Sequence, residues 1–457
     1  MTDLLVIGDV VITMDRTRRM IADGAVAISG DRIVAVGPRA EVVPAVPGAT
    51  VVGGPGHLVL PGFVNAHQHL TGDRLVRSAI PDDITSHDAV FTWAVPIHAA
   101  HTPDDDELSA TLALAEAATN GITFTVEAGT VAHPERVLAA FDRVGVGGTL
   151  GSWGWDVADG PWAGSVAEVL DRQRHTLDLA RGHPRVDGWV TLVGHDLMSD
   201  ELVVAASDLA TQRRTRLTFH LSPTPADAVA YVARTGRRPG VHLDALGVLG
   251  PHVLLAHAVH LDDEEVAVVV GRDVAIAYCP WAYLRLGQGV AAAGRHVEIM
   301  ASGGRVALGG DSENAGDAVD VLRIAALAAG LARDTAGAAS GFGAHEALEL
   351  ATIGGARAIG MDHELGSLEV GKRADVVVID ASGPAWVPRS PDPVLQLVWG
   401  NDGRSVRHVV ASGQVVVRDG RCTTVDVDAL VGPAGARQRH LLAVAGLDPR
   451  PRWPLTR

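Results

Sequence analysis

The chain has 457 residues, of which 47% are hydrophobic and 20% are charged, so we expect one large folded domain and a smaller one. Its formal net charge of -16 at pH 7 argues against nucleic acid and anionic membranes as partners. Two cysteines, Cys279 and Cys422, are too few for a disulfide framework. There is no basic, apolar secretory signal at the start and no apolar run long enough to cross a bilayer. We therefore expect a cytoplasmic protein whose partner is a small molecule.

Short apolar strands are predicted at both ends of the chain. They are 4–8, 25–28 and 32–36 near the start, and 374–380, 408–411 and 414–417 near the end. The simplest arrangement joins both sets in one small β-sandwich domain made of residues 1–57 and 363–430. Residues 431–457 then form a C-terminal tail, rich in arginine and proline, that either wraps a neighbouring subunit or covers the large domain.

The insert between these ends, residues 58–362, alternates apolar strands with helical stretches. The eight strand candidates are 58–66, 122–128, 146–153, 187–194, 216–221, 253–259, 273–278 and 305–310. One predicted helix, 104–118, has acidic residues in its first turn, where they favour the helix dipole. Eight strands in alternation with helices predict a (β/α)8 barrel. In such barrels the chemistry lies at the carboxyl ends of the strands.

Histidine or aspartate occurs at four of these strand ends, among them the sixth, which ends with His257 and His260. The first strand runs into His67 and His69, and a His-x-His pair at the end of a strand points both imidazoles to the same side. His220 lies at the end of the fifth strand and Asp311 directly after the eighth. Each has an ordinary alternative, a buried core histidine or a helix cap. Together, three imidazoles and a carboxylate predict a site for a divalent metal, with Zn2+ preferred and Fe2+ as the alternative.

The chain resembles the amidohydrolase superfamily over nearly its whole length, in particular the branch of nucleobase and S-adenosylhomocysteine deaminases and triazine hydrolases. The segments that carry the resemblance are 60–69 (LPGFVNAHQH), 255–262 (LAHAVHLD), 308–311 (LGGD) and 366–375 (GSLEVGKRAD). The resemblance implies that His67, His69, His220 and Asp311 ligate the metal. It also implies that His257, at the end of the sixth strand, holds the attacking water or the tetrahedral oxygen.

The resemblance further implies one metal ion rather than two. Dinuclear members carry a bridging carboxylated lysine at the end of strand four, and no lysine stands there; His195 occupies that region and resembles a substrate-contacting residue, although a role in orienting the loop is equally open. A bound divalent metal lowers the pKa of its water to about 7. With Asp311 as proton acceptor and His257 stabilising the developing charge, we predict hydrolysis of a non-peptide C–N bond, foremost the deamination of a planar nitrogen heterocycle.

One part of the family pattern is missing. Deaminases of this branch carry His-x-x-Glu at strand five, whereas this chain has Pro223 three residues after His220. Either Ser222 or another acid protonates the substrate, or the substrate needs no such protonation. The second possibility keeps the metal chemistry with another leaving group: an alkylamine, a halide or an opened cyclic amide. A non-catalytic scaffold is the alternative from another class, and the intact ligand set argues against it.

Five further residues are candidates for substrate contacts, each with a structural alternative. Glu127 ends strand two, with a buried ion pair as its alternative, and Glu313 follows Asp311 in what could be a solvated loop. The aromatic candidates are Trp93, in the long segment after strand one, and Tyr278 and Trp281 at strand seven; simple packing explains these equally well. The resemblance also makes a homodimer possible.

Overall fold

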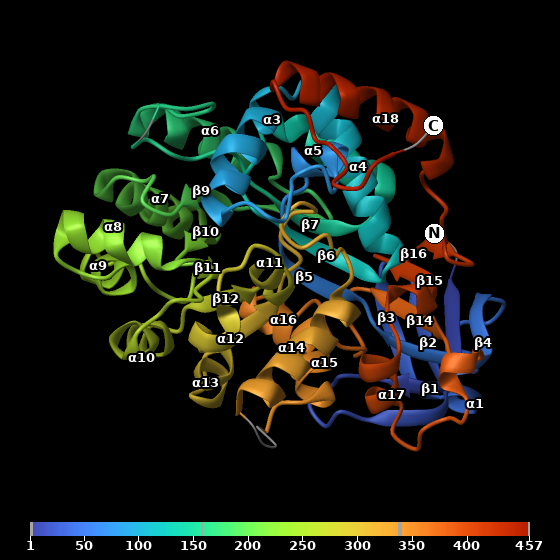
Figure 1. Ribbon diagram of the computed structural model, residues 1–457. Helices are drawn as coiled ribbons and strands as arrows, with labels where there is room; N and C mark the ends of the chain where they lie inside the picture. The colour runs from blue at the N-terminus through green and yellow to red at the C-terminus, as the bar shows by residue number, and fades with distance from the viewer. Residues whose placement is uncertain (1–2, 158, 337–340, 456–457) are drawn as a thin grey trace.

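The structure is a computed structural model and describes residues 3–157, 159–336 and 341–455. Two parts are visible in Figure 1: a ring of strands surrounded by helices, and a sheet to which both ends of the chain contribute. The first strands, coloured blue, lie beside the orange and red strands from the end of the chain. The site described below belongs to the ring, and the sheet lies beside the ring.

Both ends of the chain form one eight-stranded sheet, ordered β17-β16-β15-β14-β4-β1-β2-β3. Its strands are β1 (Leu4–Ile12), β2 (Met20–Ser29), β3 (Arg32–Pro38), β4 (Thr50–Pro61), β14 (Val376–Asp380), β15 (Val406–Ala411), β16 (Gln414–Arg418) and β17 (Arg421–Cys422). The two ends meet in the antiparallel pair of β4 and β14, where Pro61 lies opposite Val376. The expectation that both strand sets share one sheet is therefore correct, while the two-layered sandwich form and its exact limits remain predictions.

The predicted strand 58–66 is divided between the two parts of the fold. β4 continues to Pro61 in the sheet of the chain ends, and the first strand of the ring, β5 (Phe63–Gln68), begins after Gly62. A Cβ atom on Gly62 would lie only 2.0 Å from the Oγ1 atom of Thr123, so glycine is needed for this close passage. One continuous apolar run thus serves two sheets, and hydrophobicity alone does not mark the change.

Parallel strands form the ring, which matches the predicted (β/α)8 barrel. In the described part of the chain they are β5, β6 (Ile122–Glu127), β7 (Gly147–Leu150), β8 (Val186–Gly188), β9 (Val190–Gly194), β10 (Leu217–Leu221), β11 (Val253–His257), β12 (Ala275–Tyr278) and β13 (Arg305–Leu308). They form the sheets β5-β6-β7-β8 and β13-β12-β11-β10-β9. Only Trp189 separates β8 from β9, so these two share one position of the barrel. A parallel bridge between Gln68 and Asp311 connects the ends of the ring.

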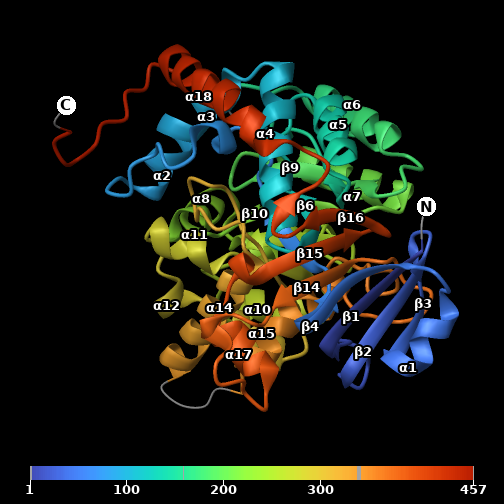
Figure 2. The same ribbon diagram turned by 90° about the vertical axis from the view of Figure 1, so that its right-hand side faces the viewer.

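Helices cover the outside of the ring (Figure 2). The longer ones are α4 (Pro103–Thr119), α5 (Pro134–Val144), α6 (Val166–Leu179), α7 (Asp200–Arg213), α8 (Pro225–Thr235), α10 (Asp263–Gly271), α14 (Val321–Ala336), α15 (Ala344–Ala351) and α18 (Val427–Val444). The other described helices are α1 (Arg39–Val42), which packs on β2 and β3 of the sheet, and α2 (Ser86–Asp88), α3 (Val95–Ala99), α9 (Pro239–Ala245), α11 (Pro280–Arg285), α12 (Val290–Ala293), α13 (His296–Ala301), α16 (Ile353–Ala358) and α17 (Pro393–Gly400). Within the described ranges, none of the helices has both the length and the apolar character needed to cross a bilayer.

Two helices show how capping and charge place the outer layer. α4 confirms the predicted helix 104–118: Thr102 caps it, with its side chain accepting from the Asp105 amide, in a reciprocal capping box. The C-terminal helix α18 lies beside α4 in both views (Figures 1 and 2). Its Arg437 donates to both carboxylate oxygens of Asp105, at 2.5 and 2.7 Å, and Leu441 is fully buried. Part of the predicted tail therefore packs on the outer wall of the barrel.

Candidate active site

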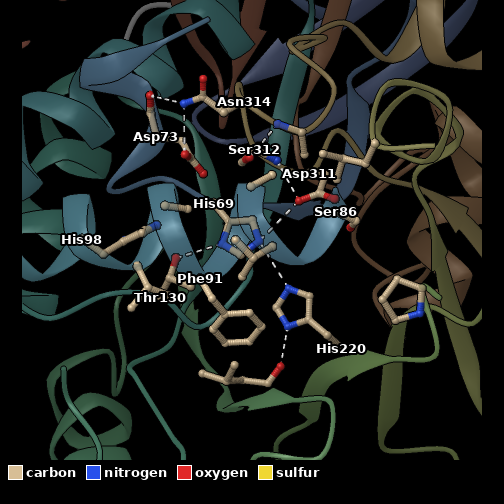
Figure 3. A pocket seen from close by; sticks show the side chains of 18 of the residues that line it. His69, Asp73, Ser86, Phe91, His98, Thr130, His220, Asp311, Ser312 and Asn314 are labelled. Carbon is tan, nitrogen blue, oxygen red and sulfur yellow. Dashed lines mark hydrogen bonds and ion pairs between the residues drawn. The ribbon is translucent and has the colours of Figure 1, made fainter. Parts of the chain in front are cut away.

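Four side chains meet at the carboxyl ends of the barrel strands. His67 is part of β5, His69 follows it, His220 is part of β10 and Asp311 lies just after β13. The Nε2 atom of His69 lies 3.3 Å from Nε2 of His220 and 3.4 Å from Oδ1 of Asp311. Nε2 of His67 is 3.9 Å from the same Asp311 oxygen. Figure 3 shows His69 between Asp311 and His220, so residues more than 200 positions apart converge on one point.

The donor atoms of this cluster fit a divalent cation. Both ring nitrogens of His67 are buried and lack a hydrogen-bond partner among the described residues, which is costly for polar atoms unless another group binds them. Burial lowers the pKa of His67 well below its ordinary value and keeps the ring neutral, the form that binds metals. Ligand atoms of His67, His69 and Asp311 lie within 4.8 Å of one another. Imidazole nitrogen with carboxylate oxygen is a donor set of zinc and similar ions.

The outer nitrogens of two imidazoles are held by neighbouring groups. The Nδ1–H of His220 donates to the carbonyl of Val193 at 2.6 Å, which leaves its Nε2 as a lone pair directed at the cluster. Nδ1 of His69 lies 2.9 Å from the hydroxyl oxygen of Thr130. Such contacts fix the orientation and tautomer of a ligand. The sequence reasoning did not find Thr130, because its sequence neighbours give no sign that it faces His69.

Glu127 supports the loop that carries Thr130. Its two carboxylate oxygens accept from the backbone amides of Gly129 and Thr130, at 2.7 and 3.3 Å. Burial raises the pKa of Glu127 to about 7. The carboxylate therefore lies behind His69, and it is not among the residues that line the active-site cavity.

Three residues at these strand ends have strained backbones. φ is 62° at Asp311, 77° at His257 and 53° at His195, although L-residues seldom adopt positive values. Such conformations persist where the surrounding structure imposes them, and they cluster at functional sites. Burial opposes ionisation of Asp311, but the hydrogen bond with His69 and the nearby imidazoles lower the pKa of its carboxyl well below the ordinary range.

His257 lies at the end of β11, with its ring centroid 5.3 Å from that of His67. Its Nδ1 atom is buried without a hydrogen-bond partner in the described chain. Burial lowers the pKa of His257 to about 4, so the ring is neutral at pH 7. The carbonyl of His257 accepts from the ring of His296 at 2.7 Å, which fixes the strand end. A neutral imidazole on the cavity wall can donate a hydrogen bond to a developing oxyanion.

His195 follows β9 and pairs with an aspartate that the sequence reasoning missed. Its Nδ1 lies 3.1 Å from Oδ2 of Asp227, and that same oxygen accepts from the Ser222 amide at 2.8 Å. The ring stacks on His220 with an interplanar angle of 14°. Burial disfavours the charged ring, but Asp227 outweighs it and raises the pKa of His195. A signal for Asp227 existed, because it is an acidic residue in the first turn of α8, seven residues after His220.

These groups line a cavity of about 130 Å³ whose other walls are mostly apolar. His69, His195, His220, His257 and Asp311 all contribute to it, and Figure 3 shows several of these side chains around one space. The apolar and aromatic part of the wall comes from Ile80, Val90, Phe91, Val95, Trp153, Trp155 and Leu286. Planar apolar walls suit a flat, aromatic ligand.

The structure does not bring the remaining substrate candidates to this wall. Trp93 is partly exposed in η3 (Ala89–Ala94), whereas its neighbour Phe91 lines the cavity. Tyr278 stacks on His296 with ring centroids 4.1 Å apart, and Trp281 lies beneath the guanidinium of Arg323. A role in substrate binding remains a prediction for these residues and for Glu127.

Glu313 lies outside the cavity lining as well. It is fully buried, 3.5 Å from Arg74, and burial raises the pKa of its carboxyl to about 7. The solvated-loop alternative is therefore wrong, because the loop after β13 folds inward. Pro223 does line the cavity, so no carboxylate stands at that position. The carboxylates on the wall are Asp311 and Asp73, of which the second escaped the sequence reasoning.

Comparisons with known proteins agree with this geometry. The amidohydrolase family model matches residues 58–416, and a model of the imidazolonepropionase-like composite domain of bacteria matches residues 24–45. A protein of Syntrophobacter fumaroxidans named 5-methylthioadenosine/S-adenosylhomocysteine deaminase is 30% identical over 429 residues, which are 94% of this chain and 96% of that protein.

Solved structures that are similar to this chain are also named as deaminases and hydrolases. An adenosine deaminase from Xanthomonas campestris with bound zinc has a TM-score of 0.91 at 27% identity, covering 97% of this chain and 99% of that one. An atrazine chlorohydrolase from Arthrobacter aurescens complexed with zinc has a TM-score of 0.85 at 26% identity, covering 95% of this chain and 99% of that one. Since the family model spans most of the chain and contains the whole His/Asp cluster, this protein is a hydrolase of the amidohydrolase family.

Proposed function

We propose that this amidohydrolase is a deaminase that uses one divalent metal ion, zinc in the first instance, to hydrolyse an amino group from a planar nitrogen heterocycle. The observation that carries the proposal is the cluster of His67, His69, His220 and Asp311, of which the last three line a small cavity with aromatic side chains in its wall. Similarity to proteins named as deaminases of adenosine and S-adenosylhomocysteine, and the zinc in two similar structures, support it.

The residues of the chain would share the work as follows. When bound, the metal ion supplies a Lewis acid that lowers the pKa of its water. Asp311 is ionised at neutral pH, so its carboxylate accepts the proton of the attacking water. His257, neutral at pH 7, donates a hydrogen bond to the oxygen that adds to the carbon under attack. His195, held by Asp227, orients the ring of the substrate.

A second candidate keeps the same site but expels another group. Pro223 occupies the place where a proton-donating glutamate is expected, and a proline side chain has no proton to give. This observation favours substrates that need no ring protonation, with a halide, an alkylamine or a cyclic amide nitrogen as the leaving group. One similar structure is named an atrazine chlorohydrolase.

Two measurements test the proposal. Metal analysis of the purified chain should find about one equivalent of zinc or a similar ion; less than about half an equivalent after supplementation would favour a scaffold without catalysis. A screen for ammonia release over purines, pyrimidines, pterins and triazines should find a substrate. Silence across that screen, with turnover of a chloro or alkylamino heterocycle, would establish the second candidate instead. A His220→Ala variant, which lacks a ligand, is the negative control for both.

We also propose that residues 1–57 and 363–430 form the β-sandwich domain, residues 58–362 the barrel and residues 431–457 the C-terminal tail. The protein is proposed to act on a small molecule in the cytoplasm. A homodimer is part of the same proposal. Size-exclusion chromatography with light scattering tests it, since a mass near the 47.5 kDa of one chain would contradict a dimer.

A further inference from the structure

Asp73 is a carboxylate on the cavity wall that the reaction described above does not use. It begins η2 (Asp73–Val76), the short 3-10 helix after β5, and is 4% exposed. Gly72 makes this placement possible: its φ is 76°, and a Cβ atom there would lie 2.0 Å from the ring of His98, another residue of the cavity wall. The chain is thus built to bring an acidic side chain to an otherwise largely apolar space.

Neutral groups hold the Asp73 carboxylate in place. The Asn314 amide donates to Oδ1 of Asp73 at 3.0 Å and to the backbone carbonyls of Asp73 and Val76, both at 3.3 Å. Asn314 in turn accepts from the Ile80 amide at 3.2 Å. Figure 3 shows the carboxylate between Asn314 and His69, on the opposite side of His69 from His220. Asp73 is therefore on the other side of His69 from His220, whose strand end is where the missing glutamate is expected, and does not replace that glutamate in position.

Among the described residues, no arginine or lysine pairs with this carboxylate; the imidazole of His69 and the side chains of Asn314 and Ser312 are the groups that interact with it. Among the described residues Asp73 has no salt bridge, and the cavity lining contains neither arginine nor lysine. The amide nitrogen of Gln288, another residue of the wall, donates to the Ser86 hydroxyl at 3.0 Å. An ionised carboxylate has about four acceptor positions, so Asp73 can accept further hydrogen bonds besides those from Asn314 and Ser312. The best donor available to the closed cavity is one carried by the ligand.

We propose that Asp73 selects substrates with a second N–H donor, besides the amino group that leaves, on the ring edge that faces away from His220. This inference rests on the proposed function and narrows the substrate class to diamino-type or amidine-like heterocycles. The same carboxylate disfavours ligands with a phosphate or carboxylate tail, because it repels them and the cavity wall offers no arginine or lysine in exchange. Asp73 is then a determinant of specificity that acts through direct contact with the ring.

Matched pairs of probes test this on the full-length, zinc-loaded protein. Diaminopurine is compared with methyladenine, and diaminopyrimidine with aminomethylpyrimidine; in each pair a methyl group replaces the amino group that does not leave. For the unmodified protein we expect kcat/KM, or 1/Kd by calorimetry where no turnover occurs, to favour the diamino member about tenfold to a hundredfold. In Asp73→Asn, which keeps the shape and the contact with Asn314, the ratio should fall to about twofold.

The controls separate recognition from folding. Asp82→Asn removes a charge from an exposed position of the same segment and should keep the wild-type ratio. If Asp73 only supports the loop, Asp73→Asn will weaken both members of a pair equally, which overturns the proposal. Absence of any preference, or of any binding, in the unmodified protein overturns it as well. If the diamino probes bind preferentially through Asp73 but no ammonia is released, this inference stands and the proposed deamination is wrong. If ammonia is released without a preference for the diamino probes, the deamination stands and this inference is wrong.

Discussion

The hydrogen bond between Thr130 and His69 provides a sharp test of the metal site. Thr130→Val keeps the volume of a buried side chain but removes the hydroxyl oxygen that lies 2.9 Å from Nδ1 of His69. The backbone contacts of Thr130, with Glu127 and with the hydroxyl of Thr71, do not involve this hydroxyl. The substitution therefore changes the orientation and basicity of one imidazole and leaves the loop in place.

The expected loss follows from the environment of that imidazole. Without Thr130 as a partner, a buried Nδ1–H is left unsatisfied, which costs about 1–3 kcal/mol. Partners of this kind typically contribute about tenfold to a hundredfold to metal affinity. The two ranges agree, because a factor of ten corresponds to about 1.4 kcal/mol. We expect Thr130→Val to bind zinc about tenfold to a hundredfold more weakly than the unmodified protein.

Competition with a chromophoric chelator measures this affinity directly. Thr130→Ser retains the hydroxyl and serves as the matched control, with an affinity within about threefold of the unmodified protein. If the valine variant binds zinc as tightly as the unmodified protein, the hydrogen bond does not hold the ligand. If the serine variant loses as much affinity as the valine variant, packing of the methyl group is responsible instead.

Three further predictions concern catalysis, pH and the C-terminal helix. His257→Gln should lower kcat about a hundredfold to ten-thousandfold at unchanged metal content, because the imidazole that stabilises the reacting atoms is lost. Burial lowers the pKa of His296 to about 4 from 6.5, so the unfolded chain takes up the proton first as the pH falls. That group should therefore reduce the free energy of unfolding by up to about 3 kcal/mol between pH 7 and pH 4, and His296→Gln should remove this dependence in urea unfolding. Arg437→Met should cost about 1–2 kcal/mol in the same assay, because it removes the cationic partner of the buried Asp105.

Each of these has an outcome that would contradict it. Loss of metal from His257→Gln would make that residue a ligand. Equal pH slopes for His296→Gln and the unmodified protein would show that His296 is protonated or exposed in the folded state. Arg439→Met, an exposed arginine on the same helix, is the control for Arg437→Met; equal losses would mean that the pair with Asp105 contributes nothing specific.

Local patterns were sufficient for most of the fold. Strand candidates matched the barrel strands closely, because runs of branched apolar residues between glycine and aspartate have few other stable conformations. The helix 104–118 was recognisable from its acidic first turn. The prediction of one barrel strand over 58–66 was wrong for residues 58–61. β4 and β5 belong to different sheets but form one apolar run in the sequence, and the change between them is at Gly62, which passes close to Thr123.

The sequence by itself determined the cluster of histidines and aspartate, because the backbone geometry of a strand end already directs His67 and His69, and a barrel gathers such ends on one face. Only the tertiary structure decided which side chains reach the cavity: it placed Asp73 there and left Glu127, Glu313 and Tyr278 behind it. The reason is that the direction of a loop side chain depends on partners far away in the chain, such as Asn314 for Asp73 and Asp227 for His195, and no local pattern records those partners.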